Sequence, residues 1–126
     1  MFERSSVERL KKISDKISSI LNKCEGGVAQ ALADEDVLQP AIMMQFINIH
    51  ALLKGLQESN DLQALAIFSK DEIRAINATR NIASHEYERL NFELIEIAIK
   101  DYLPTLNQKI TSALKPYRRG KSEGEI

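Results

Sequence analysis

Five polar residues that could do chemistry lie close together in the sequence: Arg80, Asn81, Ser84, His85 and Tyr87. An imidazole can gain or lose a proton near neutral pH. A guanidinium binds phosphate oxygens and stabilises the negative charge that develops during phosphoryl chemistry. A histidine beside an arginine therefore suits phosphodiester chemistry, with a tyrosine hydroxyl that could orient a phosphate or accept a modification.

The spacing of Arg80 and His85 leaves two ways to bring them together. Five residues along an unbroken α-helix would set the two side chains about 140° apart. Either the helix unwinds just after Ser84, or the two groups meet in a cleft between subunits. A histidine near a helix end is more often a surface or capping residue, so the spacing alone does not define a site.

The helix that carries this segment is predicted over residues 69–84. Ser69 and Glu72 have the spacing of a capping box, in which each side chain caps the backbone N–H group of the other residue. The polar stretch 85–91 is expected to end the helix. The five polar residues therefore lie at its C-terminal end.

Arg80 is expected to point at the core or at a subunit interface, between Ile73 and Ile76, on the face that also carries Ala83. Two further polar residues share this face, Asn77 and Ser84. A buried guanidinium without a partner costs several kcal/mol, on the order of the penalty for an uncompensated ion. Two alternatives stay open: an anionic ligand, or a structural ion pair with a core-facing carboxylate such as Glu96 or Asp101.

The other apolar residues predict the helices that must position this one. Helical spacing of apolar side chains predicts long helices over 6–24, 37–58 and 92–114, and shorter helices over 28–33 and 62–68. Asp61 would cap the second short helix, Asn91 would cap the last long one, and Pro104 predicts a kink there. Since five glycines and three prolines allow few turns, we expect an all-α bundle of four to five helices.

The predicted helix over 37–58 is apolar on two sides. Phe46 and Leu53 belong to one face, whereas Met44, Ile47 and Ala51 belong to the other. Such a helix needs cover on both sides. A second copy of the chain would provide the second cover, so we expect a homodimer; the alternative is a central helix in a monomeric bundle.

Composition and charge restrict the remaining possibilities. A chain of 126 residues fits one domain, expected over residues 1–114 and followed by a flexible tail over 115–126. The net charge of −1 provides no global basic field, so any contact with nucleic acid must be local. Without an apolar leader or a membrane-length apolar run, and with Cys24 as its single cysteine, the protein is expected in the reducing cytoplasm, away from membranes.

No cofactor or metal is expected. The sequence has no histidine or carboxylate cluster with metal-site spacing and no glycine-rich phosphate loop. The second histidine, His50, is interpreted as a packing or interface residue, because nothing in the sequence gives it a partner.

The string Arg-x-x-x-x-His-x-Tyr, with Asn81 directly after the arginine, resembles the motif of HepT-like HEPN domains. Its position at the end of the third main helix of a short all-α chain strengthens the resemblance. So do the acidic stretch before Ala41, the Ser-x-x-Glu opening at Ser69, and the segment 101–106 late in the last helix. The resemblance covers roughly residues 7–114.

The resemblance implies a HEPN-type antiparallel bundle that dimerises, so that the motifs of two subunits line one cleft. In active members this cleft is a metal-independent ribonuclease site. By resemblance, His85 would activate the 2′-hydroxyl of RNA and Arg80 would stabilise the phosphate. The supporting polar residues would be Asn77, Asn81 and Ser84.

The resemblance also implies a partner. HepT-like proteins are typically toxins encoded beside a minimal nucleotidyltransferase antitoxin, which adenylylates the motif tyrosine, here Tyr87. The added negative charge would lie over an anion-binding cleft. Two alternatives are a non-catalytic HEPN subunit that presents nucleotide or substrate to a nucleotidyltransferase, and a helical dimerisation protein in which Arg80 is ion-paired.

Overall fold

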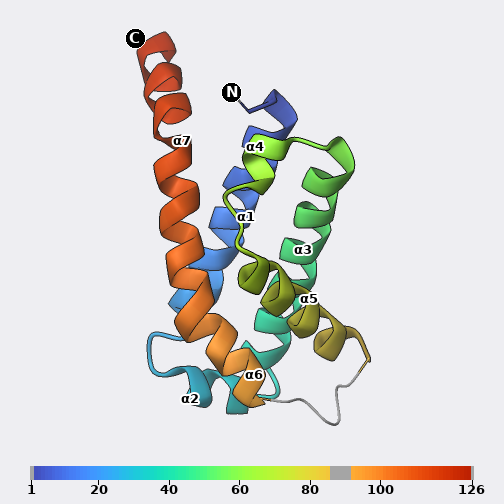
Figure 1. The fold of residues 1–126 in the computed structure, drawn as a ribbon. Helices are drawn as coiled ribbons and strands as arrows, with labels where there is room; N and C mark the ends of the chain where they lie inside the picture. Colours follow the sequence, from blue (N-terminus) through green and yellow to red (C-terminus); the bar gives the residue numbers. More distant parts are fainter. Residues whose placement is uncertain (1, 86–91, 126) are drawn as a thin grey trace.

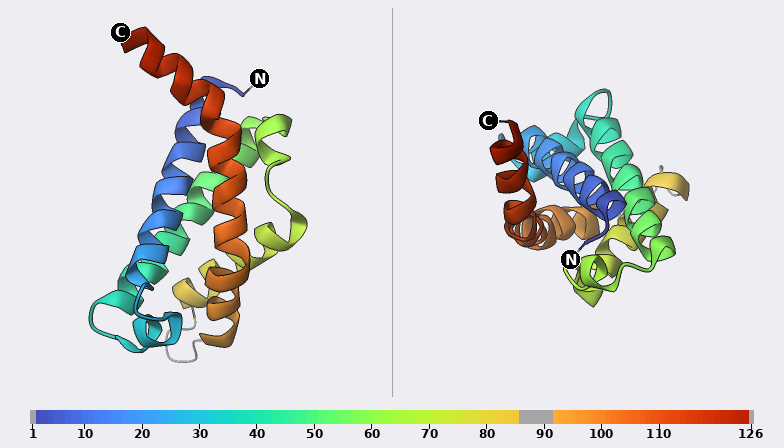
Figure 2. Two further views of the ribbon diagram at one scale, coloured as in Figure 1. Left: turned by 90° about the vertical axis from the view of Figure 1, so that its left-hand side faces the viewer. Right: turned by 90° about the horizontal axis from the view of Figure 1, so that it is seen from above.

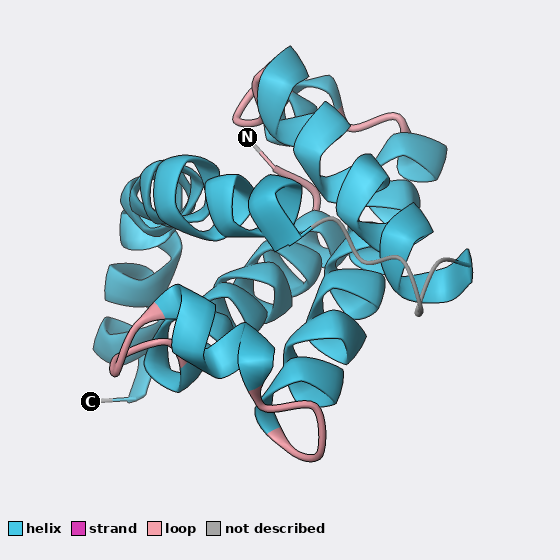
Figure 3. Ribbon diagram, turned by 90° about the horizontal axis from the view of Figure 1, so that it is seen from below, coloured by secondary structure: helices cyan, strands magenta, loops and turns pink. Residues whose placement is uncertain are grey.

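The computed structural model describes residues 2–85 and 92–125, with side chains described for 2–83 and 92–117. These residues form helices joined by short turns, and no strand occurs among them (Figures 1 and 3). In chain order the helices are α1 (Arg4–Lys23), α2 (Val28–Ala33), α3 (Leu38–Ser59), α4 (Leu62–Leu65), α5 (Lys70–His85), α6 (Phe92–Ile97), the π-helical segment η2 (Ala98–Tyr102) and α7 (Leu103–Glu125). The predicted all-α fold is confirmed.

Three long helices, α1, α3 and α7, form the body of the bundle (Figure 1). Helix α1 packs against both α3 and α7, and α5 crosses α3 (Figure 2). Each long helix buries one apolar stripe, as amphipathic helices of a globular bundle do. The fully buried side chains at the centre include Leu10, Ile17, Phe46, Ile49, Leu106 and Ile110. This core holds α3 in place as the support for α5.

Asp61 links two helix ends. Its carboxylate accepts a hydrogen bond from the backbone N–H of Ala64 at 3.2 Å, which caps α4 as the sequence predicts. The same carboxylate accepts another from the backbone N–H of Glu3 at 3.0 Å, just before α1. These bonds, above all the one from Glu3, lower the pKa of Asp61. The bonds stabilise the carboxylate form, so the link depends on pH.

Asp61→Ala is expected to lower the free energy of unfolding by about 1–2 kcal/mol at neutral pH, because it removes a helix cap. A depressed folded-state pKa stabilises the fold above the ordinary pKa of 3.8, and the stabilisation is lost as pH falls through the folded-state value. The difference between wild type and Asp61→Ala should therefore shrink in urea titrations as pH falls from about 5 to about 2. Asp61→Asn, which still caps, is the control. A pH-independent difference would contradict the role of the charge.

The last helical stretch departs from regular α geometry at the place where the sequence predicts a kink. The π-helical segment η2 ends at Tyr102, two residues before Pro104. Proline has no N–H to donate to the carbonyl four residues earlier, and a π-helical turn is one way in which a helix accommodates such a disturbance. A second proline, Pro116, lies inside α7, whose C-terminal end bends away from the bundle (Figure 2).

Helix α7 continues past the domain boundary expected at residue 114. The ring of Tyr117 stacks on Phe2 with 5.5 Å between ring centroids, and its hydroxyl accepts a hydrogen bond from the Phe2 N–H at 2.8 Å. Packing between the two ends of the chain therefore extends to Tyr117, and the flexibility of the tail stays a prediction. Among the described residues no helix is both long and apolar enough to cross a membrane.

Candidate functional site

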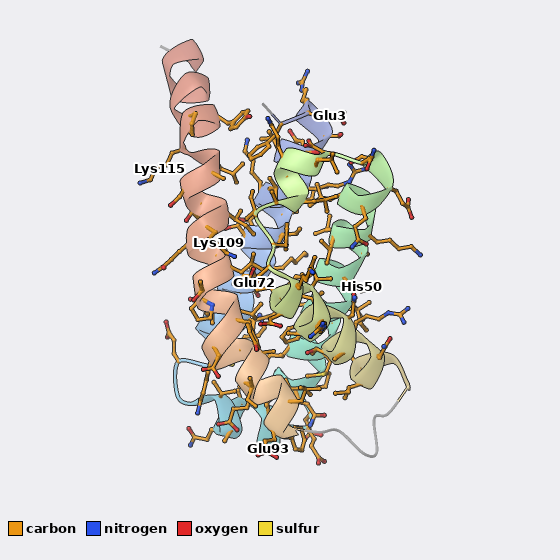
Figure 4. The ribbon with its side chains drawn as sticks, in the orientation of Figure 1. Glu3, His50, Glu72, Glu93, Lys109 and Lys115 are labelled. Carbon is orange, nitrogen blue, oxygen red and sulfur yellow. The ribbon has the colours of Figure 1, made fainter. Side chains whose placement is uncertain are left out.

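The start of α5 is fixed by the predicted capping box. The Ser69 N–H donates to Glu72 Oε1 at 2.8 Å, and the Glu72 N–H donates to Ser69 Oγ at 3.1 Å. Lys109 Nζ of α7 lies 2.7 Å from the same Glu72 oxygen (Figure 4). The Glu72 side chain is only 4% exposed. This buried contact holds α5 against α7 and so sets the position of every later residue on α5.

The buried stripe of α5 differs from the predicted one. It consists of Glu72, Ile76, Thr79 and Ala83, which follow one another at helical spacing. The Thr79 hydroxyl donates to the backbone carbonyl of Ala75 at 2.7 Å, so this buried polar group is satisfied within the helix. The centre of the inward face therefore lies one residue before Arg80.

The prediction that Arg80 points into the core is wrong. Its side chain is half-buried at the edge of α5, whereas Asn77 and Asn81 are exposed. A long arginine side chain packs its methylene groups against apolar neighbours and keeps its charged end near water. The guanidinium therefore lies where a ligand from solvent can reach it.

The structural ion pair expected as an alternative for Arg80 is absent from the described part of the chain. Glu96 pairs with Lys100 instead, at 2.7 Å, and Asp101 is exposed. The one hydrogen bond recorded for Arg80 among the described side chains is a long one, 3.4 Å from Nη1 to Asn81 Oδ1. A guanidinium carries five N–H donors. Most of them stay available to an anion as far as the described residues go.

His50 of α3 is a neighbour that the sequence did not reveal. It is half-buried where α5 crosses α3 (Figure 4). Its pKa is lowered, first by burial and then by the positive charges of Arg80 and Lys54. The interpretation as a packing residue without a partner missed this electrostatic contact, because only the tertiary packing of α3 on α5 brings the two side chains together.

His85 is the last residue of α5, and the helix shows no unwinding up to it. The first of the two routes, in which the chain unwinds just after Ser84, is therefore not found as far as His85. The side chains of Ser84 and His85, and all of Tyr87, lie outside the described part of the structure. Among the described residues no group of three His, Cys, Asp or Glu side chains is placed to hold a metal ion.

Comparison with known proteins gives one match. The model of a family described as Ribonuclease HepT-like matches residues 7–113, which runs from the first turn of α1 into α7. No curated protein and no solved structure gave a significant match. The matched segment includes Arg80, His85 and the whole of α3 and α5. The chain belongs to the HepT-like ribonuclease family.

Proposed function

We propose that this protein is a ribonuclease toxin of a toxin–antitoxin module, acting in the cytoplasm and cleaving RNA without a metal ion through Arg80 and His85. The family supports ribonuclease activity. The observation that carries the assignment of the site is the half-buried Arg80, which has only one long hydrogen bond to Asn81 among the described residues. A guanidinium with unused donors at the surface suits a phosphodiester.

In the proposed reaction the RNA provides its own nucleophile. The His85 imidazole takes the proton of a 2′-hydroxyl, and the 2′-oxygen forms a bond to the adjacent phosphorus. The bond from phosphorus to the 5′-oxygen breaks, and that oxygen takes up a proton. The products are a 2′,3′-cyclic phosphate and a free 5′-hydroxyl. Arg80 stabilises the additional negative charge on the phosphoryl oxygens, while Asn77, Asn81 and Ser84 support the site.

The site is proposed to lie between two copies of the chain. On α3, Val37 is 64% exposed and Met44 56% exposed, and Ile47 is half-buried. Exposed apolar side chains along one helix often mark a surface that a partner covers. A second copy on this face of α3 would lie beside α5 and could bring its own Arg80 and His85 to a shared cleft.

Met44→Glu is expected to convert the dimer into monomers, because a carboxylate would be buried between two apolar surfaces. Sedimentation velocity at several protein concentrations measures the change. Lys54→Glu, which also changes a charge on an exposed position of α3, has a side chain near the proposed RNA site and is therefore unsuitable; Glu58→Lys is the control. A wild-type chain that sediments as a monomer would contradict the proposed interface.

The proposed antitoxin is a nucleotidyltransferase that adenylylates Tyr87. Its target lies two residues after His85, so the added phosphate would compete with RNA for the same guanidinium. The competing candidate is a non-catalytic subunit that binds nucleotide for such a transferase. The modest net charge of −1 is compatible with weak RNA affinity and keeps this candidate in the test.

Induced expression in a bacterial host separates the two functions. Wild type should arrest growth, and His85→Ala and Arg80→Ala should not. Arg74→Ala is the matched control, because Arg74 is an exposed arginine on the same helix whose nearest carboxylate is Asp71 at 3.8 Å. Harmless wild type at equal protein level would contradict the toxin and favour the binding subunit.

A further inference from the structure

The proposed cleavage needs two proton transfers, and the motif offers one histidine. One transfer removes the proton of the 2′-hydroxyl, and the other delivers a proton to the departing 5′-oxygen. A positioned acid or base contributes about 10²–10⁴-fold to the rate of such a step. His85 can serve only one of the two transfers at a time. A second titratable group close to Arg80 would supply the other.

His50 is the described side chain that meets this requirement. It lies on α3 where α5 crosses (Figure 4), half-buried, with Arg80 as a charged neighbour on the facing helix. The other charge that acts on it is Lys54, one turn further along α3. On another side of α3, Arg9 of α1 lies against Gly55. The described charges around His50 are therefore cationic, which is the setting of an anion site.

We propose that His50 is the second proton-transfer residue of this site, donating a proton from its imidazolium to the 5′-oxygen while Arg80 holds the phosphate. This role rests on the proposed ribonuclease function. As the 2′-oxygen bonds to phosphorus, His85 gains the 2′-hydroxyl proton. As the bond from phosphorus to the 5′-oxygen breaks, His50 loses its proton to that oxygen. Exchange with solvent restores both imidazoles.

The charge balance explains how His50 becomes protonated only when RNA is bound. In the free protein, burial and the neighbouring cations lower the pKa of His50, so the neutral imidazole dominates at neutral pH. A phosphodiester bound to Arg80 adds a negative charge beside the imidazole, which raises its pKa. Binding of RNA therefore takes up a proton, and the acid is loaded at the moment of use.

The decisive experiment replaces the leaving group. RNA is cut by the wild-type protein, its cleavage position is mapped, and the 5′-oxygen at that position is then replaced by sulfur, which leaves without protonation. His50→Gln should slow cleavage of ordinary RNA by about 10²–10⁴-fold and cleavage of the sulfur-bridged RNA by less than about tenfold. His85→Ala should slow both, since the 2′-hydroxyl still needs a base.

The outcomes distinguish this inference from the proposed function. Wild-type protein that cuts neither RNA overturns both. Wild-type protein that cuts ordinary RNA, with His50→Gln slowed equally on both substrates or on neither, overturns only the role of His50. Melting temperatures of the variants show whether a slow variant is a folded one.

A second measurement does not depend on activity. The pKa of His50, followed by NMR in the full chain, should rise when a 2′-O-methyl RNA oligonucleotide binds. In the free protein it should also rise in Arg80→Ala and stay unchanged in Arg74→Ala. A pKa that ignores both the oligonucleotide and Arg80 would overturn the inference.

Discussion

Replacing Arg80 by alanine should lower the rate constant of RNA cleavage by about 10²–10³-fold, because it removes a donor to charge that develops in the transition state. His85→Ala should lower it by about 10²–10⁴-fold, because the general base is lost. Neither change removes a buried contact of a described side chain, since Arg80 is half-buried and holds only a long bond to Asn81. The melting temperature of Arg80→Ala should stay within about 3 °C of wild type.

The controls separate charge from geometry. Arg80→Lys keeps the charge but loses the planar fork that binds two phosphate oxygens, so it should recover only part of the activity. Arg74→Ala, which removes an equal charge from an exposed position of α5, should cleave RNA as wild type does. Full activity in Arg80→Ala, or a loss that tracks unfolding, would show that Arg80 serves the fold instead.

Lys109→Ala should lower the free energy of unfolding by roughly 2 kcal/mol. The change leaves the Glu72 carboxylate, only 4% exposed, with no cation beside it. Breaking a fully buried pair costs about 3–5 kcal/mol. The smaller figure applies because the Lys109 side chain is 39% exposed and the Ser69 N–H still bonds to Glu72.

A second substitution tests the cause of this loss. Glu72→Gln removes the charge yet keeps an oxygen that can accept the Ser69 N–H. The double variant Lys109→Ala/Glu72→Gln should therefore be more stable than Lys109→Ala alone. Urea unfolding of all four proteins measures the coupling. Lys115→Ala, at an exposed lysine of α7, is the control and should change little (Figure 4). Additive losses would mean that the two side chains do not stabilise each other.

The helices and their caps could be predicted because they depend on residues three or four positions apart. Ser69 and Glu72 form their capping box, and Asp61 caps the helix that follows it, as the sequence indicates. These bonds form within one turn of chain, so no tertiary packing is needed to find them.

The orientation of Arg80 could not be predicted in the same way. Hydrophobic spacing treats Glu72 and Thr79 as surface residues, yet both are buried, one paired with Lys109 and one bonded to its own helix. Their burial turns α5 and brings Arg80 to the edge. His50 was missed for a related reason: its position beside Arg80 depends on how α3 and α5 cross, which no local pattern encodes.

The most direct test of the proposed activity is the chemistry of the cleaved ends. Purified wild-type protein, in EDTA, should convert RNA into fragments that carry 2′,3′-cyclic phosphates and 5′-hydroxyls. An RNA of the same sequence with 2′-O-methyl groups should stay intact, and His85→Ala should be inactive. Cleavage of the methylated RNA, 5′-phosphate ends, a requirement for a divalent metal, or full activity in His85→Ala would contradict the proposed mechanism.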